Sequence, residues 1–493
     1  MKRKGLSVFL FLLGAALAAQ SSESQPVNAT QLMAWLTAGV PSSRLARLVQ
    51  ERGFANLPGQ EQIRQLESAG ADATLVRALN KTSLKPSAAA SPATSPIPAA
   101  LLQAAADARA QRFHQAELAL RQASSSDPQN AALHFALGAM LRQQESWDDA
   151  IDEITLSAQL MPDFPENHSS LAYIFYRLDD GPNAIAEART ALSMDPQNAE
   201  AYQFLGLALY SNGQYGAAVH AFDESLARES DNADTYYDLG ITLHAGGNLP
   251  AAIAAYRHAI HLNGAFWEAH SNLALILHEQ NELEEAIAEY REAKRLAPEE
   301  ASVRNNLGNT YCDKGDFDAA MLELSELYRQ HPEWEQGHGC LARAYMSKKN
   351  YGNAIAELQL AVRQNPTGSA EHRVLGEALL LDDKLDEGVR ELRLAVTLNP
   401  DSDAAHRDLG TALFQQQQLA AAEKEFREAI RLNASPDNHY SLAACLMTLD
   451  RYEEALSELE IAARLDPERT LYRARRDELR KLMQMQTKET DSR

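Results

Sequence analysis

Cysteine is scarce in this sequence, with three residues in a chain of 493. Three cysteines are too few for a disulfide framework. Cys312 and Cys340 occupy adjacent copies of a recurring helical pattern, but they stand six residues apart in register, which is about 9 Å along a helix. We therefore predict that they form no disulfide bond. All three, Cys445 included, are expected to be small buried residues.

Positive charge and long apolar runs are also in short supply. The formal net charge is −22, and the sequence pI is about 5.1. Such a polyanion repels nucleic acid and anionic lipid, so neither is an expected partner. Beyond the first twenty residues, no stretch supplies the roughly 20 apolar residues that a membrane-spanning helix needs. Most of the negative charge is expected to lie on a solvated outer surface.

The first residues have the composition of an export signal. Three basic residues at 2–4 precede an apolar run at 6–13, and Ala16-Leu17-Ala18 follows it. This order predicts a secretory signal over residues 1–18, cleaved after Ala18. A membrane anchor is the alternative, but the run is too short to span a bilayer. The protein is therefore expected to be exported, to the periplasm or the cell exterior.

Residues 28–82 are predicted to form a small helical domain of three or four short helices. Gly39, Gly53 and Gly70 separate the helical stretches, and Trp35 and Phe54 belong to the expected core. The segment has no catalytic or metal-binding spacing, which favours a docking or capping module. A linker is predicted over residues 83–96, within LKPSAAASPATSPIPA, where four prolines prevent helix formation. It is expected to uncouple the small domain from the rest of the chain.

A unit of 34 residues recurs eleven times over residues 97–467. Position 7 is Leu in ten repeats, positions 8 and 20 are Gly or Ala in all eleven, and position 32 is Pro in eight. The apolar positions fall on one face of each of two helices. Small residues at 8 and 20 let the two helices approach closely, and proline at 32 ends the second. Such hairpins bury their faces only by stacking, which predicts a solenoid.

This pattern resembles the tetratricopeptide repeat family, whose unit carries an aromatic residue, Leu-Gly, Tyr, Ala, Phe and Pro at these spacings. The resemblance implies an all-α, right-handed superhelical solenoid of about eleven helix-turn-helix repeats. After the last repeat, residues 468–487 place Leu471, Leu479 and Leu482 on one face. We predict that they form a C-terminal capping helix over the exposed end of the solenoid.

In that family, positions 5, 9 and 12 of the first helix line a concave groove that binds partner peptides. We call these positions the inner stripe. The predicted groove residues are Tyr173, Tyr176, Tyr210 and Tyr237 in the early repeats and Asn305, Asn309, Arg343, Arg373 and Arg407 in the later ones. The hypothesis is an extended peptide with aromatic contacts at its first half and an acidic stretch or carboxyl terminus held by the arginines. The alternative is that the arginines pair with neighbouring acids such as Glu377.

Metal binding is not favoured, although seven of the fourteen histidines share position 4 of the repeat: His134, His168, His270, His338, His372, His406 and His439. Equivalent positions in stacked repeats lie roughly 8 to 10 Å apart, whereas a shared zinc needs nitrogens within about 2 Å of it. These histidines are expected to fill the slot that Tyr202 and Tyr236 occupy in other repeats. Glu166 stands at position 2 of its repeat, in the first turn of its helix, where the helix dipole is expected to stabilise its negative charge.

The sequence favours a non-catalytic scaffold for protein–protein interaction that binds proteins or peptides and needs no cofactor. No stretch remains for a catalytic domain once these segments are assigned. One alternative is an envelope assembly or secretion factor with two docking sites. A less favoured one is part of a repeat-guided glycosyltransferase system, because Asn272 and Asn306 resemble part of the asparagine ladder of O-linked N-acetylglucosamine transferases. Asn305 stands where chaperone-binding members of the family use lysine.

Overall fold

The computed structural model describes residues 26–56, 58–81, 96–331, 334 and 336–491, and helices make up its secondary structure there apart from one isolated bridge between Val27 and Phe54. The chain divides into two compact halves, residues 1–264 and 265–493. The predicted signal and all but the last residue of the predicted linker lie outside the described residues. Among the described helices, none has the length and apolar character needed to cross a membrane.

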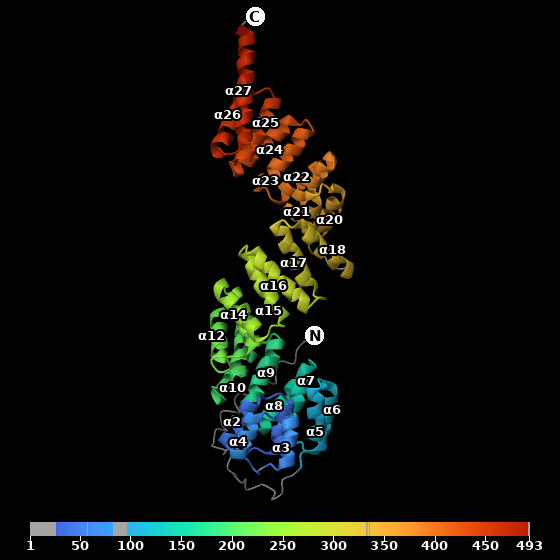
Figure 1. The fold of residues 1–493 in the computed structure, drawn as a ribbon, viewed down its shortest axis with the longest axis vertical. Coiled ribbons are helices and arrows are strands. Elements are labelled where there is room, and N and C mark those ends of the chain that lie inside the picture. The colour runs from blue at the N-terminus through green and yellow to red at the C-terminus, as the bar shows by residue number, and fades with distance from the viewer. Residues whose placement is uncertain (1–25, 57, 82–95, 332–333, 335, 492–493) are drawn as a thin grey trace. The chain divides into compact units, whose positions relative to one another are not determined.

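The first half contains four short helices followed by five helical hairpins (Figure 1). The short helices are α1 (Ala29–Thr37), α2 (Ser42–Arg52), α3 (Gln60–Ser68) and α4 (Ala73–Lys81). The hairpins are α5 (Ala99–Arg109) with α6 (Phe113–Ser126), α7 (Ala131–Gln143) with α8 (Trp147–Leu160), α9 (Pro165–Arg177) with α10 (Gly181–Met194), α11 (Ala199–Ser211) with α12 (Tyr215–Leu226), and α13 (Ala233–Ala245) with α14 (Leu249–Leu262).

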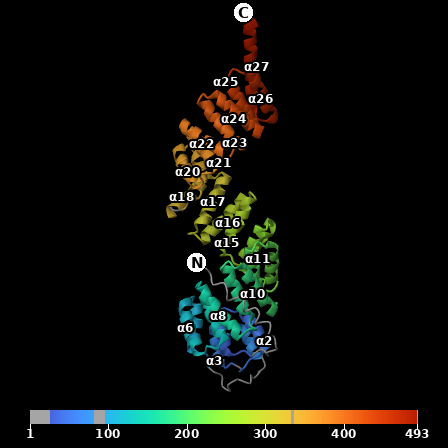
Figure 2. The same ribbon diagram turned by 180° about the vertical axis from the view of Figure 1, so that it is seen from behind.

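The second half contains six hairpins and a terminal helix, seen from behind in Figure 2. They are α15 (Trp267–Glu279) with α16 (Leu283–Leu296), α17 (Ala301–Lys314) with α18 (Phe317–Gln330), α19 (His338–Ser347) with α20 (Tyr351–Gln364), α21 (Ser369–Leu381) with α22 (Leu385–Leu398), α23 (Asp403–Gln415) with α24 (Leu419–Leu432), α25 (Pro436–Thr448) with α26 (Tyr452–Leu465), and α27 (Thr470–Asp491). The prediction of an all-α repeat solenoid is confirmed. Helix α27 packs against α26, with Tyr472 and Leu479 fully buried.

Small residues at position 8 are required by the packing within each hairpin. A Cβ atom added to Gly206 of α11 would lie 2.7 Å from the ring of Phe222 on α12. One added to Gly240 of α13 would lie 2.6 Å from the ring of Tyr256 on α14. Both distances are shorter than van der Waals contact, so a larger side chain would force the helices apart. The alanines at position 20, such as Ala218, are fully buried between the same helices.

The turn inside each hairpin is set at position 15, which has a left-handed backbone in every repeat. Its φ runs from 57° at Gln111 to 84° at Gly315. Only three of the eleven residues at this position are glycine, and most of the others are Asp, Asn, Glu or Gln. Asn and Asp tolerate this conformation better than most residues. The repeated turn gives all hairpins the same connection.

The N-terminal helices share one hydrophobic core with the first repeats, so the predicted uncoupling of residues 28–82 from the solenoid is wrong. The core runs from Val27 to Ile174, and α1 packs against both α5 and α7. The fully buried ring of Trp35 stacks on that of Phe164 at 4.8 Å between centroids. About fifty residues cannot bury a core of their own efficiently, and the repeats supply the missing cover.

Two arginines of α2 also hold the N-terminal helices against the repeats. Arg44 forms an ion pair with Glu166 in the first turn of α9, and its Nε also lies 3.3 Å from Asp195. Arg52 donates from Nη2 to the carbonyl oxygen of Asp163 at 2.6 Å. Arg44, Arg52 and Glu166 are all buried. The role of Glu166 is thus more than a favourable interaction with the helix dipole, because its ion pair with Arg44 also holds the N-terminal helices in place.

Cys312 and Cys340 form a disulfide bond, so the prediction against one is wrong. Their Cα atoms lie 5.9 Å apart, within the usual range for a disulfide of about 4.4 to 6.8 Å. The prediction assumed that adjacent first helices begin at the same position of the repeat. Only then does an offset of six residues keep the two cysteines apart along the helix axes. Helix α17 begins at position 1 of its repeat, whereas α19 begins at position 4, at His338. Cys445 is buried and free, as predicted.

Candidate binding surface

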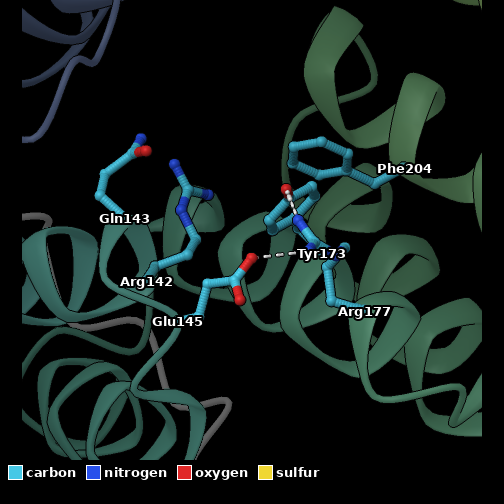
Figure 3. A pocket seen from close by; sticks show the side chains of 6 residues that line it. All are labelled: Arg142, Gln143, Glu145, Tyr173, Arg177 and Phe204. Atoms are coloured by element: carbon cyan, nitrogen blue, oxygen red, sulfur yellow. Dashed lines mark hydrogen bonds and ion pairs between the residues drawn. The ribbon is translucent and has the colours of Figure 1, made fainter. Parts of the chain in front are cut away.

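A hollow of about 270 Å³ opens on the first helices of three early repeats (Figure 3). It is lined by Arg142, Gln143, Glu145, Tyr173, Arg177 and Phe204. Arg177 donates to the hydroxyl oxygen of Tyr173 at 2.9 Å and to Glu145 at 2.9 Å. The Arg142 guanidinium lies 5.2 Å from the centre of the Tyr173 ring, a cation–π contact. Tyr173 is therefore the central residue of this hollow.

The predicted tyrosines form a series of aromatic contacts along the first half. Tyr173 contacts Tyr176 at 6.4 Å and Phe204 at 5.1 Å between ring centroids. Tyr210 contacts Tyr215 at 5.7 Å on the second helix of its own repeat. Tyr237 likewise contacts Tyr256 of its own repeat, at 5.9 Å. These four tyrosines are partly buried, so each combines packing with an accessible edge.

Asp238, on α13, is the acidic residue of this tyrosine region. Its Oδ2 accepts a hydrogen bond of 3.0 Å from Nε2 of Gln203 on α11. Burial raises the pKa of Asp238 to about 7, and the nearby negative charge of Asp234 contributes, while the Gln203 hydrogen bond acts against the shift. Burial also raises the pKa of Tyr176, with Asp238, Tyr173 and Tyr210 adding to the effect.

The second half has a larger hollow, of about 490 Å³, on its own first helices. Asn309 and Arg343, both predicted groove residues, line it together with the disulfide of Cys312 and Cys340. Asn305, another predicted groove residue, is not among the residues that line this hollow. It is buried, with 4% of its surface exposed, and donates to Asn306 at 3.3 Å. The buried disulfide thus forms part of the wall of the hollow where a ligand was predicted.

The three predicted arginines are all paired with acids. Arg343 Nη1 lies 2.9 Å from Asp313, and Arg373 Nη1 lies 2.7 Å from Asp408. Arg407 Nε lies 3.6 Å from the other oxygen of Asp408. The expected neighbour Glu377 is 3.9 Å from Arg373. The sequence named Glu377 as an example of a pairing acid, whereas the acids that pair most closely, Asp408 and Asp313, stand at positions 6 and 13, which flank the inner stripe.

The seven histidines at position 4 have carboxylate partners. Each Nδ1 lies 2.5 to 2.7 Å from a glutamate on the other helix of the same hairpin, 19 residues later in the chain. The glutamates are Glu153, Glu187, Glu289, Glu357, Glu391, Glu425 and Glu458. In three of these repeats Nε2 also contacts the carbonyl oxygen of the preceding proline, at 3.1 to 3.2 Å.

The sequence carried a signal for this pairing that was missed. Where position 4 is Tyr202 or Tyr236, the residue 19 positions later is alanine, and where it is Arg304 the partner is again an acid, Glu323, at 3.1 Å. The histidines are thus structural groups that join the two helices of a hairpin. Within the described part of the chain, no group of three or more His, Cys, Asp or Glu residues could hold a metal ion.

The model of the tetratricopeptide repeat family matches residues 101–167, 169–234, 205–265, 237–301, 305–369, 373–439 and 407–470. The chain belongs to the tetratricopeptide repeat family. Members of this family are in general non-catalytic scaffolds for protein interaction, and the repeats of this chain support that role. No curated protein matches the sequence.

Solved structures of the same repeat type are similar at a general level. MamA of Desulfovibrio magneticus RS-1 is 20% identical over 34% of this chain and 95% of that chain, with a TM-score of 0.33. PilF of Pseudomonas aeruginosa is 19% identical over 42% of this chain and 94% of that one, with a TM-score of 0.39. Yeast Tom70 is 15% identical over 79% and 95%, with a TM-score of 0.33. These scores carry no functional argument, and the family assignment rests on the repeats.

Proposed function

We propose that this tetratricopeptide repeat protein is an exported, non-catalytic scaffold that holds an extended segment of a partner protein along its inner stripe. The observation that supports it is the hollow around Tyr173, where aromatic rings and two guanidinium groups are gathered on adjacent first helices. Aromatic and arginine side chains are the residues that most often dominate binding energy at protein interfaces. Export is supported by the basic and apolar composition of residues 1–18.

The arginines of the later repeats fit an acidic segment of a partner. Arg343 and Asp313 keep 51% and 45% of their side-chain surface exposed, so their ion pair is well solvated. An exposed pair of this kind contributes about 0 to 1 kcal/mol. A partner carboxylate can therefore replace Asp313 beside Arg343 at a small cost in free energy. The partner then gains a charge-assisted hydrogen bond from Arg343.

The contacts of the N-terminal helices support one binding surface over two separate docking modules. Arg44 and Arg52 of these helices contact the repeats of the same chain, and Trp35 is covered by Phe164. The face of this segment that carries Arg44, Arg52 and Trp35 is thus covered by the repeats. An envelope assembly factor with an independent N-terminal docking module is the less favoured candidate.

Peptide selection on the full chain tests the proposal. A phage-displayed library of random dodecapeptides is panned against the wild-type protein, and selected peptides are measured by fluorescence anisotropy. Tyr173→Ala is expected to weaken their binding at least about ten-fold, as loss of an interface hot spot does. The control is Leu118→Ala, because Leu118 is 55% exposed on the second helix α6. Equal binding to the wild type and Tyr173→Ala would contradict the proposal.

The acidic part of the ligand has its own test. Among selected peptides that contain Asp or Glu, binding is measured to a chain carrying Arg343→Glu, Arg373→Glu and Arg407→Glu. Charge reversal is expected to weaken these peptides and to leave neutral ones unchanged. Unchanged affinity for the acidic peptides would show that the arginines serve only their internal partners, Asp313 and Asp408.

A further inference from the structure

Two aspartates at equivalent positions beside the inner stripe, Asp238 and Asp408, have partners of different charge. Arg373 donates from Nη1 to Oδ2 of Asp408 at 2.7 Å, and Gln203 donates from Nε2 to Oδ2 of Asp238 at 3.0 Å. The partners are 35 residues apart in both pairs, so they join position 5 of one repeat to position 6 of the next. At the later place a guanidinium neutralises the aspartate. At the earlier place the partner is a neutral amide.

Asp238 therefore lacks the counter-charge that its equivalent has. Besides its own burial, the described groups that shift its ionisation are Gln203 and Asp234, and neither is a cation. A partly buried carboxylate without a cation is costly to ionise, and the pKa of Asp238 is accordingly raised to about 7. Strongly shifted groups of this kind are concentrated at functional sites.

Tyr176 is an aromatic side chain near Asp238. Burial raises the pKa of Tyr176, the charges of Asp238 and Tyr210 add to the shift, and the cation Arg177 acts against it. The rings of Tyr173 and Tyr176 are 6.4 Å apart. Tyrosine faces attract ammonium and guanidinium groups, and the attraction increases when water is excluded. An aromatic ring can pack against the apolar stem of Lys or Arg, and a carboxylate can pair with its charged head.

We propose that Asp238, Tyr176 and Tyr210 form a subsite that takes a lysine or arginine side chain of the bound peptide, which supplies to Asp238 the positive charge that Arg373 supplies to Asp408. The subsite deepens the proposed function and rests on it. A ligand of the early repeats then carries a basic residue, whereas the arginines of the later repeats favour acidic residues. A metal ion does not fit, because a single carboxylate offers too few ligands.

The test uses the same dodecapeptide library, panned in parallel on the full-length wild type, on Gln203→Arg and on Asp238→Asn. Wild-type panning is expected to enrich Lys or Arg at one fixed place in the selected peptides. Gln203→Arg supplies a guanidinium from the chain itself and should abolish that enrichment. Replacing the enriched Lys by Gln should weaken binding to the wild type about ten-fold and change binding to Gln203→Arg by less than about two-fold.

Folding of the variants is not a confounding factor, because the Arg373–Asp408 pair shows that this geometry accepts arginine. The reverse change needs both Arg373→Gln and Arg407→Gln, because both arginines lie beside Asp408. This double variant should create a second preference for a basic residue. Peptides that bind without any basic preference, or that bind Asp238→Asn as tightly as the wild type, would overturn the subsite and leave the proposed scaffold intact. A library that yields no binder sensitive to Tyr173→Ala would contradict both.

Discussion

Single residues at position 4 of the repeat decide how the two helices of a hairpin are joined on their polar side. In seven repeats a histidine is hydrogen-bonded to a glutamate of the partner helix, and in one an arginine takes its place. His134 keeps 8% of its side chain exposed and Glu153 keeps 27%. The hydrogen bond to Glu153 raises the pKa of His134, with burial acting against it and the Pro128 carbonyl adding to it.

Glu153→Gln is predicted to destabilise the α7–α8 hairpin by about 1.5 to 3 kcal/mol near pH 6, the range for a hydrogen bond to a charged group. The folded-state pKa of His134 is raised, so the pair stabilises the fold below the unfolded pKa of about 6.5 and loses this contribution as pH rises through the folded pKa. The penalty should therefore shrink by about pH 8.5. Hydrogen-exchange mass spectrometry of α7 and α8 measures it.

The exposed neighbour Asp152 supplies the control. Asp152→Asn removes a carboxylate from the same helix without touching His134. It should change the exchange of α7 and α8 by less than about 0.5 kcal/mol at either pH. An effect of Glu153→Gln that is equal at both pH values would show that the neutral histidine, rather than its charged form, carries the contact.

At the scale of elements, the seventh and eighth repeats depart from the regular pattern. Helix α19 begins only at His338, after Gly337 with φ of 96°. The disulfide joins α17 to this shortened helix, and the bonded cysteines are buried at 1% and 7% exposure. The disulfide is thus a covalent link between successive first helices at the place where the repeat pattern is irregular.

The disulfide predicts a count of thiols. The chain has three cysteines, of which Cys445 alone is free. One thiol per chain should react with a chromogenic disulfide reagent after denaturation without reductant, and three after reduction. Closing a loop of this size stabilises a fold by about 3 to 4 kcal/mol in the chain-entropy model, so reduction should lower the melting temperature of the second half.

Two variants distinguish the disulfide from a general effect of reductant. Cys312→Ser with Cys340→Ser should melt at the lower temperature and no longer respond to reduction. Cys445→Ala should keep the response of the wild type, because Cys445 has no disulfide partner in the described chain. Three reactive thiols in the unreduced protein would show that the bond does not form.

At the scale of the molecule, each half is built from repeats whose stability is shared with their neighbours. The N-terminal helices extend this principle to a segment outside the repeat pattern, since Trp35 and Phe164 pack together in one core. They cover the first repeats as an integral cap. The buried pair of Arg44 and Glu166 fixes their position relative to α9.

Arg44→Ala is predicted to release the N-terminal helices from the repeats. It leaves Glu166 buried without its cation, which costs about 3 to 5 kcal/mol for a buried pair. Arg47→Ala is the matched control, because Arg47 is 41% exposed and lies 3.8 Å from Asp195. Limited proteolysis should cut between α2 and α5 much faster in Arg44→Ala than in Arg47→Ala. Equal rates would show that apolar packing alone holds the segment.

The regular features of this protein were determined by the sequence itself. Leucine at position 7, small residues at positions 8 and 20 and proline at position 32 predicted eleven hairpins, and the structure confirms them. These features depend on periodicity within one or two helices, where geometry follows directly from spacing in the chain. The family and its scaffold role follow from the same pattern.

Contacts between residues far apart in the chain were decided only by the tertiary structure. The disulfide, the stacking of Trp35 on Phe164 and the Arg44–Glu166 pair depend on where helices begin and how successive repeats lie against each other. The arginines of the inner stripe were predicted from the sequence as groove residues, and that role stays a prediction. The acids that pair with them most closely, Asp313 and Asp408, were not predicted, because a change of one position in register selects a different neighbour. Asp238 differs from Asp408 for the same reason: only the fold shows which side chain, Gln203 or Arg373, stands beside it.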